Sequence, residues 1–405
     1  MVAFRPHPLA DPAEFDRDLG DGEGMSALPT SPSEHSLADV MPSVAAALGA
    51  SPHNPLGIDP ARDAVLILID GLGAELIRQH AEDAPTLAAM TGRVIVAGFP
   101  ATTATSLTSL AVGAPCSKHG IVGYSFRISG ESGGPPASFN PLRWTVESSS
   151  GPSAMDRFPP RQVQQQPSVL ELLAADGVDV TYVMREDFRE SGLTRAAFRA
   201  GGDYRAASTL DEVRQGILDT FSQPSRARRF AYAYFGDLDL IGHVHGPGSP
   251  EWLQSLRAVD RCVADLATDL PRDCRLILTA DHGMVTAETV VDIDATPTLL
   301  ADVETVAGEP RVRHVYARPG SADDVLDTWR SELAGRARVI SREQALDEHL
   351  FGPDRDHADR LGDVIGIAAG GVILARTQLE KMESSLLGHH GANTTDEQHI
   401  PLLIR

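Results

Sequence analysis

Short apolar runs alternate with polar, amphipathic stretches along most of the chain. Runs such as AVLILI, VTYVM, FAYAYF and RLILT are bounded by polar or turn residues, which is typical of strands buried on both faces of a parallel sheet. Stretches with helical spacing lie between them, for example TLDEVRQGILDTF and WLQSLRAVDRCVADLATDL. This alternation predicts an α/β fold with a mostly parallel central sheet flanked by helices on both faces.

The pattern changes along the chain and predicts three parts. Residues 1–35 are rich in Pro, Asp, Gly and Ser with little periodicity, which predicts a flexible tail. Residues 36–285 and 379–405 carry the alternating pattern of a core. Residues 286–378 contain a β-α-β pattern and one further apolar strand, which predicts a small inserted α+β subdomain. Within the core, the Gly-, Pro- and Ser-rich residues 129–166 are predicted to form a long irregular excursion.

Composition narrows the class of protein. The 405 residues carry a formal net charge of -21 and no block rich in Lys or Arg, which disfavours duplex nucleic acid as a partner. A small phosphorylated substrate remains compatible with this negative charge if metal ions supply local positive charge.

No apolar run approaches the roughly 18 residues that cross a bilayer. The N-terminus lacks signal-peptide features, and Cys116, Cys262 and Cys274 form no CxxC pair. We therefore expect a cytoplasmic protein with reduced thiols and no membrane contact; the oligomeric state is open.

Acidic residues and histidines fall at the ends of the apolar runs. Asp70 ends AVLILID, and Asp281 and His282 end RLILTADH. Because open α/β sheets bind ligands at the carboxyl ends of their strands, we expect these side chains to converge. Asp239 and His243 lie four residues apart after FAYAYFGD, so a helix would place both on one face.

Two ambiguities remain in these segments. Asp237 and His245 are close rivals of the Asp239 and His243 pair, and the C-terminal HHG offers both His389 and His390. One histidine of the HHG motif, together with the aspartates and histidines at the strand ends, would form a set of metal ligands that contains no cysteine. Such a set is typical of a divalent-metal site with mixed oxygen and nitrogen ligands.

A further segment, FPATTATSLTSLAVGAP, adds hydroxyl groups. Pro100 ends the preceding strand, and the Thr- and Ser-rich run is a natural helix N-terminus whose helix ends near Gly113. A hydroxyl there would lie beside unpaired backbone N–H groups and the positive end of the helix dipole, an arrangement that binds phosphate. A threonine hydroxyl needs activation, which a divalent metal would supply. The segment therefore suggests hydrolysis at phosphorus.

The motifs LILIDGLG, FPATTATSLTSLAVGAPCSKHGIVGY, DLDLIGHVHG, LTADHGM and HHGANTTDEQHIPLL occur in this order. Together they resemble the nucleotide pyrophosphatase/phosphodiesterase branch of the alkaline phosphatase superfamily, over roughly residues 60–285 and 379–405. The resemblance implies an alkaline-phosphatase-like core and two divalent metal ions, usually Zn²⁺, with Mn²⁺ as the alternative. It also implies a threonine nucleophile and a phosphothreonine intermediate.

Carried over to this chain, the resemblance assigns roles to seven residues. One metal ion would be bound by Asp70, Asp281, His282 and the catalytic Thr103, and the other by Asp239, His243 and His390. Thr103 is preferred to Thr102 because the family places its nucleophile three residues after a proline and ten before a glycine. His390 is preferred to His389 because the family histidine directly precedes a glycine.

The chain departs from the family at one place. Well-known members carry a phosphoryl-binding asparagine downstream of the nucleophile, and this chain has Gly123 and Tyr124 there. We expect the Tyr124 hydroxyl, or the backbone N–H groups of this segment, to contact the substrate instead. Lys118 and Arg127 lie nearby and are expected to be ordinary exposed basic residues.

The resulting prediction is a metal-dependent phosphoric ester hydrolase, a phosphodiesterase or nucleotide pyrophosphatase. A phosphomonoesterase or phosphonate hydrolase of the same superfamily is the nearest alternative. A non-catalytic metal- or nucleotide-binding protein is the alternative of another class. The absence of a C/S-x-P-x-R motif disfavours a sulfatase.

Overall fold

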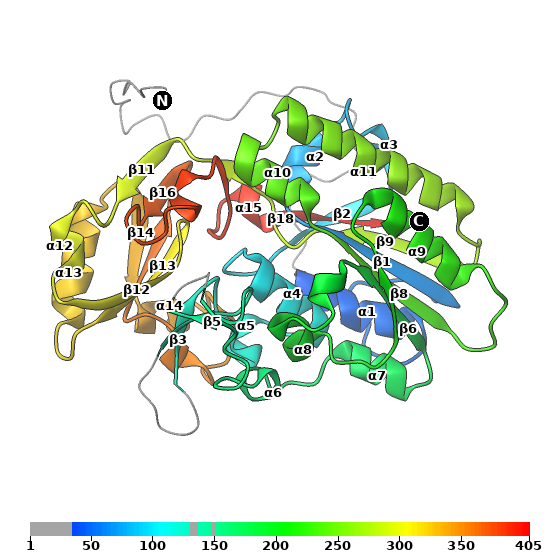
Figure 1. The fold of residues 1–405 in the computed structure, drawn as a ribbon, viewed down its shortest axis with the longest axis horizontal. Coiled ribbons are helices and arrows are strands. Elements are labelled where there is room, and N and C mark those ends of the chain that lie inside the picture. Colours follow the sequence, from blue (N-terminus) through cyan, green and yellow to red (C-terminus); the bar gives the residue numbers. More distant parts are fainter. Residues whose placement is uncertain (1–34, 130–136, 148–150) are drawn as a thin grey trace.

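A seven-stranded sheet lies at the centre of this computed structural model, which describes residues 35–129, 137–147 and 151–405 (Figure 1). β9, β1, β8, β6 and β7 are parallel, and β18 is antiparallel to both of its neighbours. The predicted α/β fold with a mostly parallel sheet is therefore confirmed. In order across the sheet the strands are β2 (Gly92–Val96), β18 (His399–Ile404), β9 (Cys274–Thr279), β1 (Asp63–Ile69), β8 (Arg229–Phe235), β6 (Asp179–Met184) and β7 (Asp203–Ala206).

Helices cover both faces of this sheet because its central strands are apolar on both sides; every residue of β1 is buried. Two groups of helices form these layers, and members of each group contact one another (Figure 1). One layer consists of α2 (Ala74–Gln79), α3 (Pro85–Ala89), α9 (Leu210–Phe221), α10 (Asp237–His245) and α11 (Pro250–Asp269). The other consists of α1 (Val40–Ala47), α4 (Thr103–Val112), α7 (Val169–Ala175) and α8 (Gly192–Ala197), with α5 (Cys116–His119) next to α4.

The register of the parallel strands aligns their carboxyl ends. Ile69 of β1 pairs with Phe235 of β8, and Leu68 pairs with Thr279 of β9. The loops that begin at Asp70 and Ala280 therefore start side by side at one edge of the sheet. This is the edge at which ligands bind in open α/β folds.

The Gly-, Pro- and Ser-rich excursion contains more regular structure than predicted. Its described part includes a three-stranded antiparallel sheet, which begins just before residue 129, and one short helix. Phe126 and Phe139 pair across this sheet, and Phe139 packs edge-on against Trp144, so a small apolar cluster stabilises it. The prediction of an irregular segment holds for most of the described residues in 129–166 and is wrong for 137–140, 145–146 and 160–163. The elements are β3 (Phe126–Ile128), β4 (Ala137–Asn140), β5 (Thr145–Val146) and α6 (Pro160–Val163).

A second unit lies at the left of Figure 1, within the segment predicted as an insertion. Its four-stranded sheet has the order β12-β13-β15-β14, and all three pairings are antiparallel. One group of its side chains surrounds Trp329 in a separate apolar cluster, whereas Val312, Ile365 and Ile367 join the main core. The elements are α12 (Pro297–Leu300), β12 (Val303–Glu309), β13 (Val312–Ala317), α13 (Ala322–Glu332), β14 (Ala337–Ser341), α14 (Arg342–Asp347) and β15 (Val364–Ala368).

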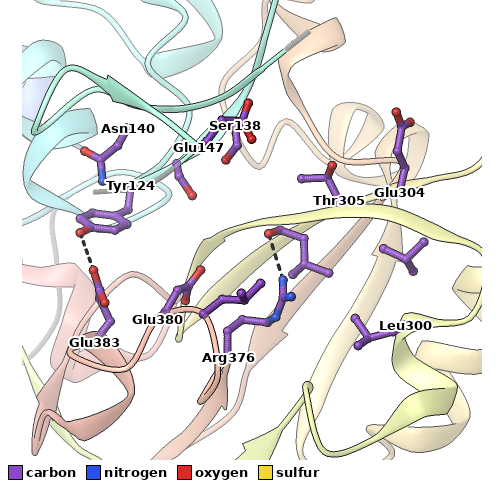
Figure 2. Close-up of a pocket in the computed structure, with 14 residues that line it drawn as sticks. Tyr124, Ser138, Asn140, Glu147, Leu300, Glu304, Thr305, Arg376, Glu380 and Glu383 are labelled. Atoms are coloured by element: carbon purple, nitrogen blue, oxygen red, sulfur yellow. Dashed lines mark hydrogen bonds between the residues drawn. The ribbon is translucent and has the colours of Figure 1, made fainter. Parts of the chain in front are cut away.

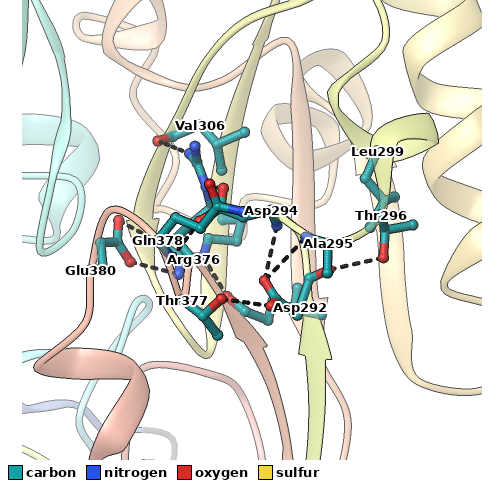
Figure 3. Close-up of polar contacts among 12 residues, drawn as sticks. Asp292, Asp294, Ala295, Thr296, Leu299, Val306, Arg376, Thr377, Gln378 and Glu380 are labelled. Carbon is teal, nitrogen blue, oxygen red and sulfur yellow. Dashed lines mark hydrogen bonds and ion pairs between the residues drawn. The ribbon is translucent and has the colours of Figure 1, made fainter.

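Two short strand pairs connect this unit to the core. β11 (Thr289–Asp292) is parallel to β16 (Val372–Ala375), and β10 (Val285–Thr286) is antiparallel to β17 (Gly388–His389). Where β11 and β16 end, Arg376 Nε donates to Asp294 Oδ1 at 2.6 Å and Thr377 Oγ1 donates to Asp292 Oδ2 at 2.6 Å (Figure 3). These contacts fix the chain that leads from β16 toward α15 (Thr395–Gln398).

Among the described residues, none of the helices has both the length and the apolar surface that crossing a membrane requires. The predicted N-terminal tail, apart from His35, lies outside the described residues.

Candidate active site

The carboxyl edge of the sheet carries a first group of possible metal ligands. Asp70 follows β1, and Asp281 and His282 follow β9, so three buried side chains meet with ligand atoms within 4.8 Å of one another. Nε2 of His282 lies 3.3 Å from Asp70 Oδ1 and 3.4 Å from Asp281 Oδ2.

A second group lies beside the first. Asp239 and His243 are on one face of α10, and His390 follows β17; their ligand atoms also lie within 4.8 Å of one another. His243 Nε2 is 3.3 Å from Asp239 Oδ2 and 3.2 Å from His390 Nε2. The His282 and His390 rings stack with centroids 3.5 Å apart, so the two groups are adjacent.

Each of the three histidines has its Nδ1 atom next to a backbone carbonyl oxygen. His243 Nδ1 lies 2.7 Å from Gly388 O, His282 Nδ1 lies 3.0 Å from Gly283 O, and His390 Nδ1 lies 3.0 Å from Ala101 O. A carbonyl only accepts, so each neutral ring carries its proton on Nδ1 and leaves the Nε2 lone pair free. Such outer contacts orient histidines that bind metal ions.

The carboxylates also have free oxygen atoms. Within the described part of the chain, Asp70 Oδ1, Asp239 Oδ1 and Asp281 Oδ2 are buried and have no hydrogen-bond partner. Buried carboxylate oxygens without a partner are costly, and a cation would compensate them. The free Nε2 atoms and these oxygens therefore fit two divalent ions with mixed oxygen and nitrogen ligands.

Burial and the charges of neighbouring residues shift the pKa values of these side chains. Burial raises the pKa of Asp70 well above its ordinary value, and the charges of Asp281 and Asp239 raise it further. Burial lowers the pKa of His390 well below its ordinary value. Burial also acts to lower the pKa of His243, but Asp239 outweighs it and raises the pKa to about 9. Clustered shifts of this kind are typical of functional sites.

Thr103 is the first residue of α4, and its side chain points into this cluster. Thr103 Oγ1 lies 3.2 Å from His282 Nε2. Thr102 is the N-cap residue of α4, it belongs to neither ligand group, and its side chain forms no capping hydrogen bond. The geometry therefore brings Thr103, and not Thr102, next to the candidate metal ligands.

The alternative ligand candidates in α10 and in the HHG motif lie apart from the two ligand groups. Asp237 and His245 are at the two ends of α10 and belong to neither group, and His245 is exposed. His389 lies outside the groups as well, with Nε2 3.1 Å from the carbonyl oxygen of Leu386. The structure thus brings together the seven residues that the resemblance selected.

Tyr124 lines a cavity of about 640 Å³ between the β3–β5 sheet and the β12 strand (Figure 2). Its hydroxyl donates to Glu383 Oε1 at 3.1 Å, and burial raises the pKa of the phenol. Glu147, Glu304 and Glu380 also line this cavity, so its wall is rich in carboxylates. A role for Tyr124 in substrate binding remains a prediction.

A smaller pocket of about 70 Å³ opens beside Thr103. Apolar and aromatic side chains form most of its wall, among them Leu107, Met184, Phe188 and Tyr232. An apolar pocket next to the reacting hydroxyl can accommodate part of an ester group.

Lys118, Arg127 and Cys116, which follow the Thr103 helix, have structural partners. Lys118 forms ion pairs with Asp354 and Asp356, and Arg127 pairs with Glu304 at 3.0 Å. Burial raises the pKa of Cys116, whose thiol donates to backbone carbonyls, so this side chain fills space as an inert thiol.

Sequence reasoning missed two residues of the site. Tyr234 in β8 donates its hydroxyl to Asp70 Oδ2, and the alternation along FAYAYF could have placed it on the same face as other strand-end groups. Glu309 is at the end of β12, far from every recognised motif, and no pattern in the sequence indicates it.

A comparison with known protein families identifies the family to which this chain belongs. The family model described as "Type I phosphodiesterase / nucleotide pyrophosphatase" matches residues 64–393, so the chain belongs to this family of phosphoric ester hydrolases. The family is metal-dependent, typically with two divalent ions. The family recognised from the sequence is therefore confirmed.

Particular relatives match over short segments. Human ectonucleotide pyrophosphatase/phosphodiesterase family member 7 is 43% identical over 60 residues, which cover 14% of this chain and 13% of the relative. The mouse family member 1 is 37% identical over 87 residues, 20% of this chain and 10% of the relative. The matched segments thus span a small part of either relative.

Solved structures match over most of the chain. Murine ectonucleotide pyrophosphatase/phosphodiesterase 5 aligns with a TM-score of 0.60 at 20% identity, covering 84% of this chain and 87% of that protein. An inactive form of that protein has been solved in complex with AMP. Phosphonoacetate hydrolase from Sinorhizobium meliloti, in complex with phosphonoformate, aligns with a TM-score of 0.62 at 17% identity, covering 85% and 90%. These similarities confirm the alkaline-phosphatase-like fold.

Proposed function

We propose that this protein is a two-metal phosphodiesterase or nucleotide pyrophosphatase in which Thr103 is the nucleophile. The observation that carries this proposal is the position of Thr103 Oγ1, 3.2 Å from His282 Nε2 at the junction of the two ligand groups. A hydroxyl at a helix N-terminus beside clustered carboxylates and imidazoles suits attack on a phosphoryl group.

The residues divide into two sets of ligands. Asp70, Asp281, His282 and Thr103 would bind one ion, and Asp239, His243 and His390 the other. Mixed carboxylate and imidazole ligands suit Zn²⁺, and Mn²⁺ is compatible with the carboxylates. Two such ions would favour the ionised form of the Thr103 hydroxyl and neutralise charge on the phosphoryl oxygens.

Each protein group then has a defined task. The Thr103 oxygen attacks phosphorus in line, a bond forms between them, and the bond from phosphorus to the departing oxygen breaks. The first turn of α4 presents backbone N–H groups that have no intrahelical acceptor, and these stabilise the phosphoryl oxygens. Water then hydrolyses the phosphothreonine and restores the free hydroxyl.

The surroundings of Thr103 favour a diester over a monoester. Lys118 and Arg127, which follow Thr103 in the sequence, are engaged in ion pairs elsewhere. A dianionic monoester would benefit from an additional cation, whereas a monoanionic diester with an apolar group suits the pocket beside Thr103. A small phosphodiester or nucleotide-like ester is the expected substrate.

A substrate panel tests this function. Bis-p-nitrophenyl phosphate, p-nitrophenyl phosphate, a p-nitrophenyl nucleotide ester and phosphonoacetate would be compared in the presence of zinc or manganese. We expect the diesters to have the highest kcat/KM. A preference of about tenfold or more for the monoester or the phosphonate would assign the protein to that alternative activity. No hydrolysis of any compound with either metal would favour a non-catalytic binding protein.

A further inference from the structure

Two hydrogen bonds from β8 hold Asp70 at the end of β1. Asp70 N–H donates to Phe235 O at 3.0 Å, and the Tyr234 hydroxyl donates to Asp70 Oδ2. Tyr234 is opposite Leu68 in the parallel pairing of β1 and β8, and Leu68 precedes Asp70 by two residues. The register of the two strands therefore places the phenol beside the carboxyl group of Asp70.

The bond from Tyr234 gives the two carboxylate oxygens of Asp70 different environments. Oδ2 accepts the phenolic hydrogen, because a carboxylate can only accept. Oδ1 is buried, lies 3.3 Å from His282 Nε2, and has no hydrogen-bond partner among the described residues. Oδ1 is thus the oxygen of Asp70 that faces the other members of its ligand group, Asp281 and His282.

The phenol itself is confined on two sides. Gly236 is the N-cap residue of α10, and a Cβ atom there would lie 3.1 Å from Tyr234 Oη and 3.2 Å from Cε1. Any larger residue at position 236 would require the hydroxyl to move. Phe188 packs edge-on against the Tyr234 ring, with centroids 5.7 Å apart. The hydroxyl group is therefore held in place before any ion binds, which is the arrangement that orients a metal ligand.

The ring of Tyr234 contacts a second part of the site. It lines the apolar pocket beside Thr103, together with Phe188 and Leu107. The hydroxyl and the ring thus face different features, Asp70 and the pocket. Because phenylalanine keeps the ring and lacks the hydroxyl, one substitution separates the two contributions.

We propose that Tyr234 is a positioning residue for the ion of Asp70, Asp281 and His282, which holds Asp70 so that Oδ1 is presented to that ion. The proposal rests on the function proposed above only in that this ligand group binds a divalent metal. Without the hydroxyl, the Asp70 carboxylate is free to rotate and must be ordered when the ion binds. Groups that hydrogen-bond to metal ligands in this way strengthen metal binding.

Two variants test this role. Tyr234→Phe removes the hydroxyl and keeps the ring. Tyr182→Phe is the matched control, because the buried Tyr182 hydroxyl donates to Phe198 O and Ala200 O, each at 3.3 Å, and Tyr182 belongs to neither ligand group. Titration of metal-free protein with Zn²⁺ against a chromophoric chelator gives the Kd of each ion without any need for activity. Far-UV circular dichroism checks that the metal-free variants are folded.

We expect Tyr234→Phe to raise the Kd of one zinc ion by about 10- to 100-fold and to leave the other nearly unchanged. Hydrolysis of bis-p-nitrophenyl phosphate by Tyr234→Phe should be lower than in the wild type at limiting Zn²⁺ and should recover in excess Zn²⁺. KM in excess Zn²⁺ should change little, because the ring still lines the pocket. Tyr182→Phe should bind both ions as the wild type does.

Other results would overturn the proposal. Wild-type Kd values in Tyr234→Phe would exclude a positioning role for the hydroxyl. An equal rise of Kd in Tyr182→Phe would show that the loss of any buried tyrosine hydroxyl weakens metal binding. A low kcat in Tyr234→Phe that excess Zn²⁺ does not restore, beside unchanged Kd values, would mean that the hydroxyl acts on the substrate and not through Asp70.

The metal titration also separates this proposal from the proposed function. If the wild type binds zinc but hydrolyses no phosphate ester, the proposed function fails, whereas a raised Kd in Tyr234→Phe still supports the positioning role. If the wild type hydrolyses the diester and Tyr234→Phe binds both ions normally, the proposed function stands and the positioning role fails.

Discussion

His243 and His390 face each other with their Nε2 atoms 3.2 Å apart. Both rings have Nδ1 within hydrogen-bonding distance of a backbone carbonyl, so in the neutral rings the two Nε2 lone pairs point at the same space. A divalent cation placed between the two lone pairs would be bound by both rings. Asp239 Oδ2 lies 3.3 Å from His243 Nε2 and completes a set of ligands for such a cation.

Metal content provides the first prediction. Purified protein should contain about two equivalents of zinc or a similar divalent metal, and a chelator should abolish hydrolysis and lower Tm. Asp281→Ala or His282→Ala should lower metal content and activity together. His389→Gln is the matched control, because His389 lies outside both ligand groups and should retain the metal. Full activity of metal-free protein would contradict the two-metal site.

The buried ion pair between Arg311 and Glu397 provides a prediction about stability. Both side chains are fully buried, so Arg311→Met would leave a buried carboxylate without its cation. We expect the free energy of unfolding to fall by about 3–5 kcal/mol, measured by urea denaturation. Arg355→Met removes a cation from an exposed pair with Glu343 and should change stability by about 1 kcal/mol or less. Equal effects of the two substitutions would show that the ion pair between Arg311 and Glu397 contributes little to the free energy of unfolding.

Acid should destabilise the protein through His314. Burial lowers the pKa of His314 to about 4, below the value of about 6.5 in an unfolded chain. The neutral ring accepts a hydrogen bond from Gly362 N–H and lies 3.1 Å from Val122 O. Its contribution to stability is therefore complete above pH 6.5 and is lost as the pH falls toward 4, by up to about 3 kcal/mol.

Denaturation measured between pH 7 and pH 4 checks this prediction. His314→Gln should flatten the fall in unfolding free energy relative to the wild type, whatever its effect on stability at pH 7. His53→Gln, at an exposed position, is the control. Identical slopes for His314→Gln and the wild type would show that His314 does not titrate in this range.

Much of the fold and most of the candidate ligands could be predicted from local pattern. Asp70 comes directly after β1 and Asp281 comes two residues after β9, and parallel pairing of these apolar strands brings both residues to one edge. Asp239 and His243 share a helical face because of their spacing alone. The choice between Thr102 and Thr103 came from family offsets, and the structure now separates the two side chains.

The parts that were missed depend on packing between distant segments. Glu309 is an ordinary strand-end glutamate in sequence, and its position beside Gly391 arises only because β12 ends against the loop that follows His390. The β3–β5 sheet was missed because its strands are short and separated by turn-forming residues, so its apolar contacts outweigh a weak local signal. Neither feature has a periodicity that could have indicated it.

The central claim, that Thr103 attacks phosphorus, is tested most directly by comparing Thr103→Ala with Thr102→Ala on bis-p-nitrophenyl phosphate, with metal content measured on the same samples. Thr103→Ala should retain both metal ions and the fold and lose at least about a thousandfold in kcat, because no positioned hydroxyl remains. Thr103→Ser should keep partial activity, and Thr102→Ala should lose far less than Thr103→Ala. An inactive Thr102→Ala beside a nearly normal Thr103→Ala would contradict the account.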